Sequence, residues 1–204
     1  MKKIVLVCFL FICFNFSNAQ EVYFTHGKNI SNYELIQESG DKIPIENGIG
    51  NSFEMGYKSK YIATTPFYYT LGLSYNQFNS LGKTTGLNME WKTNYIGLNY
   101  AFYYNFFQNK RSDFALKLGA NMHTLVYGKQ EVNQVQMDIV NNREFSGLNI
   151  GMQSGLVYNY HINSECSLVL GYTHTKLFNI SNSTKEKVLL NNQNFSVGLT
   201  IRIK

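Results

Sequence analysis

Apolar and polar side chains alternate strictly along the ten residues 194–203, near the end of the chain. The apolar positions are Phe195, Val197, Leu199, Ile201 and Ile203, and the polar or small positions are Asn194, Ser196, Gly198, Thr200 and Arg202. Successive side chains of a β-strand point to opposite faces of its sheet. A helix would spread the same residues around its circumference. The pattern therefore predicts a sheet with one apolar face and one polar face.

The same alternation recurs along most of the chain. Eight strands are predicted, at 22–36, 52–57, 69–76, 95–102, 114–123, 148–160, 168–173 and 194–203. The first is irregular, because Gly27 interrupts it and Tyr33 and Leu35 resume the pattern in the opposite phase. This phase change predicts a β-bulge at Gly27. Tyr and Phe number 15 each and Pro only 2, a composition that favours pleated strands.

The lengths of the connections predict the topology. Those after the first, third, fifth and seventh strands are long and polar, and 128–147 and 178–193 are the longest. The others are shorter and include polar turns at 108–112 and 162–165. An up-and-down barrel with both termini on one side places all its long loops at one end. We therefore expect an all-β, eight-stranded antiparallel barrel in which the last strand pairs with the first.

The first 19 residues have the pattern of a cleavable secretory signal peptide. A basic start and an uncharged apolar run at 4–14 precede small residues and the expected cleavage site after Ala19. Gln20 rather than Cys follows this site, so no lipid anchor is expected. The expected organisation is a signal peptide at 1–19 and a single barrel domain at 20–204. Removing 19 of 204 residues leaves 185, and the loss of two lysines lowers the net charge from +5 to +3.

The polar face of the predicted strands carries few charges. It is mostly Gly, Asn, Ser and Thr, and its clear charges are Glu54, Lys117 and Arg202. A sheet that faces water is normally rich in Lys and Glu, whereas small residues suit the crowded lumen of an eight-stranded barrel. Aromatic residues stand near the strand ends of the apolar face, namely Tyr57, Tyr69, Tyr100, Phe102, Tyr158 and Tyr160. We therefore expect the apolar face to meet lipid through aromatic girdles.

The signal peptide, the eight alternating strands and stretches such as Gly97-Leu98-Asn99-Tyr100 and Val197-Gly198-Leu199 resemble the small outer-membrane β-barrel family of the OmpA and OmpX type. The resemblance covers about Gln20 to Lys204. It implies a bacterial outer-membrane location, contact with outer-membrane lipid and lipopolysaccharide, and insertion by the outer-membrane assembly machinery. Barrels of this family often end in an aromatic residue, whereas this chain ends Ile203-Lys204.

Four ionisable residues form the predicted lumen polar cluster: Glu54, Lys117, His123 and Arg202. Buried charges need partners, so an internal ion-pair network is the hypothesis. The simpler interpretation is a structural, mostly plugged lumen, because such a barrel is barely wide enough for its own side chains. The alternative interpretation is a narrow, porin-like pore.

No catalytic residue, cofactor site or metal site is indicated, and the chain is not expected to be an enzyme. The alternative is a small barrel enzyme acting on lipopolysaccharide acyl chains, with His174 as its base. In the lipid A deacylases that this would resemble, a Ser stands two positions after the His, and here Lys176 stands there. Only Ser181 and Ser183 in the following loop could replace it. His26 and His161 have no further ligand at metal-binding spacing.

The remaining expectations concern partners. The weak, scattered positive charge does not favour nucleic acid. Cys166 is the one cysteine after the signal peptide, so the mature chain can form no internal disulfide. Loops on a rigid scaffold often carry function, so a structural or surface-binding protein is expected, as a monomer, with an extracellular ligand bound at the long loops.

Overall fold

The computed structural model describes residues 20–36, 42–43, 45–61, 64–84, 87–140, 145–180 and 187–203. The predicted signal peptide, 1–19, lies outside these residues. Within them, no helix is long and apolar enough to cross a membrane.

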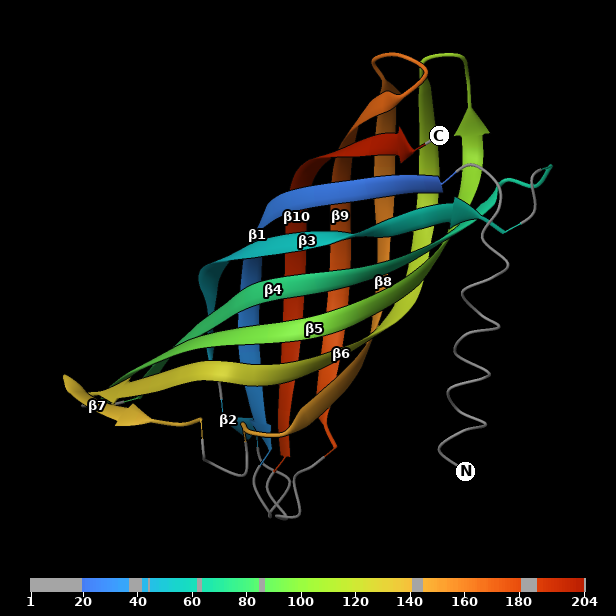
Figure 1. The fold of residues 1–204 in the computed structure, drawn as a ribbon. Coiled ribbons are helices and arrows are strands. Elements are labelled where there is room, and N and C mark those ends of the chain that lie inside the picture. The colour runs from blue at the N-terminus through green and yellow to red at the C-terminus, as the bar shows by residue number, and fades with distance from the viewer. Residues whose placement is uncertain are drawn as a thin grey trace, which may run out of the picture.

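Eight long antiparallel strands close into a ring (Figure 1). These are β1 (Gln20–Ile36), β3 (Glu46–Lys60), β4 (Phe67–Thr84), β5 (Leu87–Gln108), β6 (Ser112–Val132), β8 (Leu148–His161), β9 (Cys166–Asn179) and β10 (Lys187–Ile203). Two short strands of the described chain lie off the ring. Here β2 (Lys42–Ile43) pairs with β1, and β7 (Val135–Asp138) pairs with β6. The predicted all-β barrel of eight ring strands is confirmed.

The seam between the first and last strands is continuous. β1 and β10 pair antiparallel from Gln20 opposite Ile203 to Ile36 opposite Lys187. β1 keeps an unbroken register with both β10 and β3 at Gly27, so the predicted bulge is wrong. The physical reason is that Tyr33 faces inward like Tyr23, and its hydroxyl bonds a buried threonine inside the barrel. The aromatic ring of Tyr33 on the inner face therefore produces the apparent change in the phase of the alternation.

The strands are longer at the loop end than the alternation predicted. β4 runs to Thr84 and β5 begins at Leu87, so the predicted long loop around Gly82 and Gly86 is mostly a β-hairpin. Much of the predicted loop 128–147 is also strand, because β6 continues to Val132 and β7 follows. The β6–β7 hairpin turns at Asn133 and Gln134, whose φ angles of 47° and 71° fit a two-residue type I′ turn.

At the opposite end the turns are short, as predicted. Asn109 closes the turn between β5 and β6 by accepting backbone N–H bonds at its Oδ1 from Arg111 and Ser112, each at 2.8 Å. Asn163 does the same between β8 and β9, accepting from Glu165 and Cys166. The start of β1 and the end of β10 lie at this turn end (Figure 1).

The outer face of the ring is apolar. The alternating residues of β10, from Phe195 to Ile203, are 41–51% exposed, on the side predicted to face lipid. Aromatic residues gather on the outer face toward the turn end, including Phe67, Tyr69, Tyr100, Phe102, Tyr104, Phe106, Phe107, Phe114, Tyr158 and Tyr160. Several of these rings touch, as in the pair Phe114 and Tyr158 at 4.7 Å between centroids.

The apolar core sits inside the barrel at the loop end. We call it the loop-end plug, and it consists of Tyr33, Phe78, Trp91, Tyr95, Leu125, Ile139, Phe145, Leu177, Val188 and Leu190. Its members come from six ring strands and from the segment after β7. Tyr33, Phe78, Ile139 and Leu177 are among the largest fully buried side chains of the described chain. The lumen is therefore closed at this end by side chains packed as in a soluble core.

Candidate functional site

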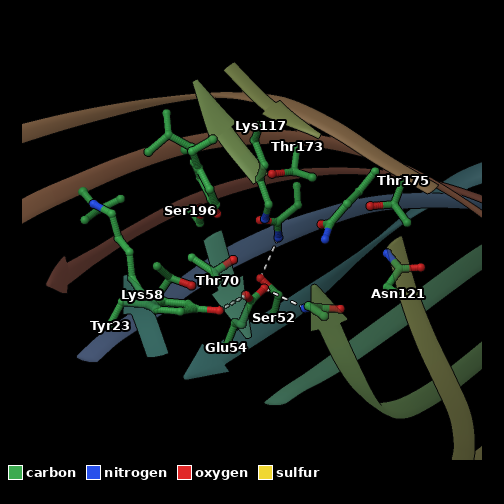
Figure 2. A pocket seen from close by; sticks show the side chains of 18 of the residues that line it. Tyr23, Ser52, Glu54, Lys58, Thr70, Lys117, Asn121, Thr173, Thr175 and Ser196 are labelled. Carbon is green, nitrogen blue, oxygen red and sulfur yellow. Dashed lines mark hydrogen bonds between the residues drawn. The ribbon is translucent and has the colours of Figure 1, made fainter. Parts of the chain in front are cut away.

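A polar cavity of about 80 Å³ occupies the middle of the lumen (Figure 2). A polar cavity this small holds a few water molecules rather than an organic ligand. Phe78 of the loop-end plug and His123 form part of its lining, beside many small polar side chains. Five buried polar atoms of lining residues have no hydrogen-bond partner in the described chain, namely Asn99 Oδ1, Asn121 Oδ1, His123 Nδ1, Gln153 Nε2 and Asn192 Oδ1.

Glu54 is the acidic centre of this cavity and lies on β3. Its two carboxylate oxygens accept hydrogen bonds from Tyr23 on β1 at 2.5 Å and from Asn99 on β5 at 2.7 Å. Figure 2 shows Tyr23 and Glu54 pointing toward each other. Gly72 on β4 makes room for this contact, because a Cβ there would collide with the Tyr23 hydroxyl. Neutral donors from two other strands thus satisfy the half-buried carboxylate.

Lys117 enters the same cavity from β6 and is 7% exposed. Its Nζ lies 5.9 Å from the centroid of the Tyr103 ring, a cation–π distance. His123, also on β6, is 3% exposed and packs near the Phe78 ring. The structure therefore brings Glu54, Lys117 and His123 to one cavity, with Glu54 bonded to Tyr23 and Asn99.

Arg202, the fourth residue of the predicted cluster, does not reach this cavity. It lies on the inner face of β10 but at the strand's end, where its side chain is 48% exposed. Its guanidinium lies 3.4 Å from Glu21 on β1, and Lys58 on β3 lies 3.3 Å from the other oxygen of the same carboxylate. The alternation gave the correct face of the strand but not the depth in the barrel.

A layer of amides between the cavity and the loop-end plug was not foreseen. Asn29 on β1 accepts hydrogen bonds at its Oδ1 from Asn192 at 3.0 Å and Asn194 at 2.9 Å, both on β10. Its own amide donates to Asn76 on β4 and to the backbone of Asn51 and Gln77. Asn192 and Asn194, two positions apart on the inner face of β10, were the available signal. This layer links β1 to its neighbours on both sides.

Several solved structures share this barrel geometry. The crystal structure of Neisserial surface protein A (NspA) matches with a TM-score of 0.53 at 13% identity, over 92% of this chain and 100% of that chain. This chain has the fold of the small outer-membrane β-barrels. A major outer membrane protein from Thermus thermophilus matches at 12% identity and a TM-score of 0.49, with coverages of 91% and 100%. Ail, the attachment invasion locus protein of Yersinia pestis, matches at 13% and 0.45, with coverages of 91% and 100%.

Likeness at this level of identity establishes the small outer-membrane barrel fold and leaves function to be argued from residues. No protein-family model matches the sequence. Comparison with curated protein sequences also gives no match.

Two further residues singled out in the sequence are placed by this fold. His174 on β9 is exposed on the outer face, and its register neighbours are Ser154 on β8 and Gln193 on β10. Ser181 and Ser183, the alternatives considered for a catalytic serine, lie outside the described residues. Cys166 begins β9 at the turn end and is a free, half-buried thiol.

Proposed function

We propose that this chain is an integral protein of the bacterial outer membrane whose lumen is structural and whose loop end binds an extracellular partner. Contact of the apolar outer face with lipid and lipopolysaccharide, export through the signal peptide and insertion by the assembly machinery are parts of this proposal. It is supported by the barrel fold, the exposed apolar face of the ring and the aromatic belt at the turn end.

The observation that carries the structural reading of the lumen is the loop-end plug. Its ten apolar or aromatic side chains fill the inside of the barrel between the polar cavity and the loop end. A conducting pore needs a continuous wet path, and a packed apolar layer between the cavity and the loop end provides none. Planar-bilayer recordings of the wild type and of Lys117→Ala are expected to give no single-channel steps. Steps in the wild type that change in Lys117→Ala would favour the narrow pore instead.

The binding surface that we propose is the protruding sheet, which consists of 79–84, 87–92, 128–132 and 135–138. It extends from one side of the barrel at the loop end, with β7 at its tip (Figure 1). All four residues of β7 are exposed, Val135 by 63% and Met137 by 46%. Among the described strands β7 pairs only with β6, so its outer edge is open to another strand. Strand addition to such an edge is a common way to bind an extended peptide.

Charged side chains stand on the protruding sheet. Lys92 Nζ lies 2.9 Å from Glu90, and this hydrogen bond raises the pKa of the lysine. Lys129 lies over the Tyr127 ring and donates to Gln136 on β7. Such charges protect an open edge from self-association while leaving it free for a specific partner.

The membrane assignment and its orientation have one direct test. Met137→Cys at the tip of the protruding sheet and the native Cys166 at the turn end lie at opposite ends of the barrel. On intact cells, a membrane-impermeant maleimide is expected to label Met137→Cys and not the wild type. After the outer membrane is permeabilised, both Met137→Cys and the wild type should be labelled. This control shows that Cys166 can react once the reagent reaches it. Recovery of the protein from the soluble periplasm, with no gel shift on boiling, would overturn the membrane assignment.

A further inference from the structure

The turn end of the lumen opens into a hollow of about 400 Å³. The polar cavity separates this hollow from the loop-end plug. Asp113, His161 and Ser167 all line the hollow. They stand on three successive ring strands, at the start of β6, the end of β8 and the start of β9. His161 and Ser167 are direct register partners, and Asp113 lies opposite Asn159, two residues before His161.

These three side chains form a chain of close polar contacts, of which the one between Ser167 and His161 is a hydrogen bond and the one between His161 and Asp113 is an ion-pair contact. Ser167 Oγ lies 2.8 Å from His161 Nδ1, and His161 Nε2 lies 3.4 Å from Asp113 Oδ2. A carboxylate accepts only, so the neutral tautomer of His161 that fits Asp113 carries its proton on Nε2. The lone pair of Nδ1 then faces the Ser167 hydroxyl and can take its proton. These are the carboxylate, base and nucleophile of a serine triad, with the roles of the two imidazole nitrogens exchanged relative to the common form.

This chain of contacts is held in place from behind. Asp113 is 3% exposed, and its two oxygens also accept from Asn159 Nδ2 at 2.5 Å and from Asn105 Nδ2 at 3.3 Å. The backbone N–H of His161 donates to the carbonyl of Arg111 at 2.7 Å. Asn163 fixes the turn between His161 and Ser167 through its two backbone hydrogen bonds. Side chains held in this way are already oriented before a substrate binds, so binding costs them little conformational entropy.

The charges around the hollow indicate the kind of ligand. Five cationic side chains line it, namely Lys58, Lys60, Lys110, Arg111 and Arg202. The acidic residues of the lining are Glu21, Asp113 and Glu165, so five positive and three negative charges leave a net charge of +2. A hollow lined by one excess sign of charge concentrates ligands of the opposite sign. Its volume is that of a small-molecule site.

The geometry points to a serine esterase site in the turn-end hollow, acting on short carboxylic esters that carry a negative charge. Ser167 Oγ attacks the ester carbonyl carbon while its proton moves to His161 Nδ1. The bond from the carbonyl to the leaving alcohol breaks, and the alcohol takes that proton. Water then attacks the acyl-serine, gives a proton to His161, and releases the acid as His161 returns the proton to Ser167. The sum is ester and water to acid and alcohol, and the site is independent of the proposed binding surface.

The test compares the folded full-length barrel in detergent with two serine variants. Ser167→Ala removes the nucleophile, and Ser154→Ala removes an exposed hydroxyl on the outer face of β8, which does not line the hollow. A fluorophosphonate probe is expected to add to Ser167 in the wild type and in Ser154→Ala, and a mass shift on the peptide that contains Ser167 reports the addition. Ser167→Ala should not be labelled. The heat-dependent gel shift confirms that each variant is folded.

Turnover is measured with 4-nitrophenyl hydrogen succinate and, as the uncharged counterpart, 4-nitrophenyl acetate. The wild type and Ser154→Ala are expected to hydrolyse the anionic ester at least about 100-fold faster than Ser167→Ala does. A wild-type rate equal to that of Ser167→Ala, with no label on Ser167, would overturn the proposal. Equal hydrolysis of the two esters, with Ser167 labelled, would overturn the anionic substrate class.

Discussion

The two ends of the lumen differ in what they bury. At the loop end, Tyr33, Phe78 and Leu177 are packed into the apolar plug and are almost inaccessible. At the turn end, the buried side chains include Asp113, Asn105 and Asn159, and beside them an open hollow carries charge and a half-exposed histidine. The same scaffold thus seals one end with hydrophobic packing and keeps the other wet and polar. Closure and polar chemistry are separated along the barrel axis, and each can be disturbed without the other.

The largest expected effect comes from opening the plug. Phe78→Ala removes a side chain that is 1% exposed, and we expect it to lower the free energy of unfolding by about 3–5 kcal/mol. Urea unfolding in detergent, followed by tryptophan fluorescence, measures this. Phe53→Ala is the matched control, because Phe53 is 43% exposed on the outer face. Equal losses in the two variants would mean that the plug does not stabilise the barrel as a core does.

The turn end is tested by Asp113→Asn, which keeps the shape of the side chain but replaces an acceptor oxygen with an amide. The donors of Asn159, Asn105 and His161 then meet one acceptor fewer. We expect a loss of about 2–3 kcal/mol in the same unfolding experiment. Asp138→Asn on exposed β7, where the remaining oxygen can still accept from Val140, should change stability by less than about 0.5 kcal/mol.

Between the two ends, Tyr23→Phe removes only the hydroxyl that donates to Glu54. The carboxylate keeps its bond from Asn99, so the expected loss is smaller, about 1–2 kcal/mol. The unfolding midpoint in urea gives the value. Tyr160→Phe on the outer face, where the side chain is 40% exposed, is expected to leave the midpoint unchanged.

The smallest effect is a gain at the tip of the protruding sheet. Gln134 holds a φ of 71°, which glycine adopts without the Cβ penalty of about 1 kcal/mol. Gln134→Gly should therefore slow hydrogen exchange of the β7 amides by up to about 5-fold without moving the global midpoint. Gln136→Gly, in extended backbone on the same hairpin, is expected to speed that exchange. Faster exchange in both would show that the turn is not strained.

The middle of the barrel was predictable from sequence because its inner residues are small and polar and its outer residues apolar. The eight strands, the inward face of β10 and the pairing of β1 with β10 all followed from that alternation. At the loop end Val188 and Leu190 point inward, and Leu189 between them points outward. Both faces of the strand are apolar there, so the alternation does not reveal the strand and the sequence predicts a loop.

The sites at the turn end were harder to predict because depth and distance along the chain are not periodic properties. Arg202 has the parity of the lumen but stands one residue from the end of β10. His161 and Ser167 flank the turn at 162–165 that the sequence predicts, so their pairing could have been predicted from it. Asp113 is 48 positions before His161, and only the barrel brings them together.

The seam described above also sets the order in which the barrel can form. Each hairpin joins neighbouring segments, whereas Gln20 meets Ile203 across 183 positions of the chain. Loop-closure entropy makes such a pairing the slowest to form. Until it forms, β1 and β10 are both open edges, and the amides of Asn192 and Asn194 lack Asn29 as their acceptor. Ring closure is therefore the step at which an assembly factor would accelerate folding most, and an arrested intermediate would be an open sheet prone to pairing with another chain.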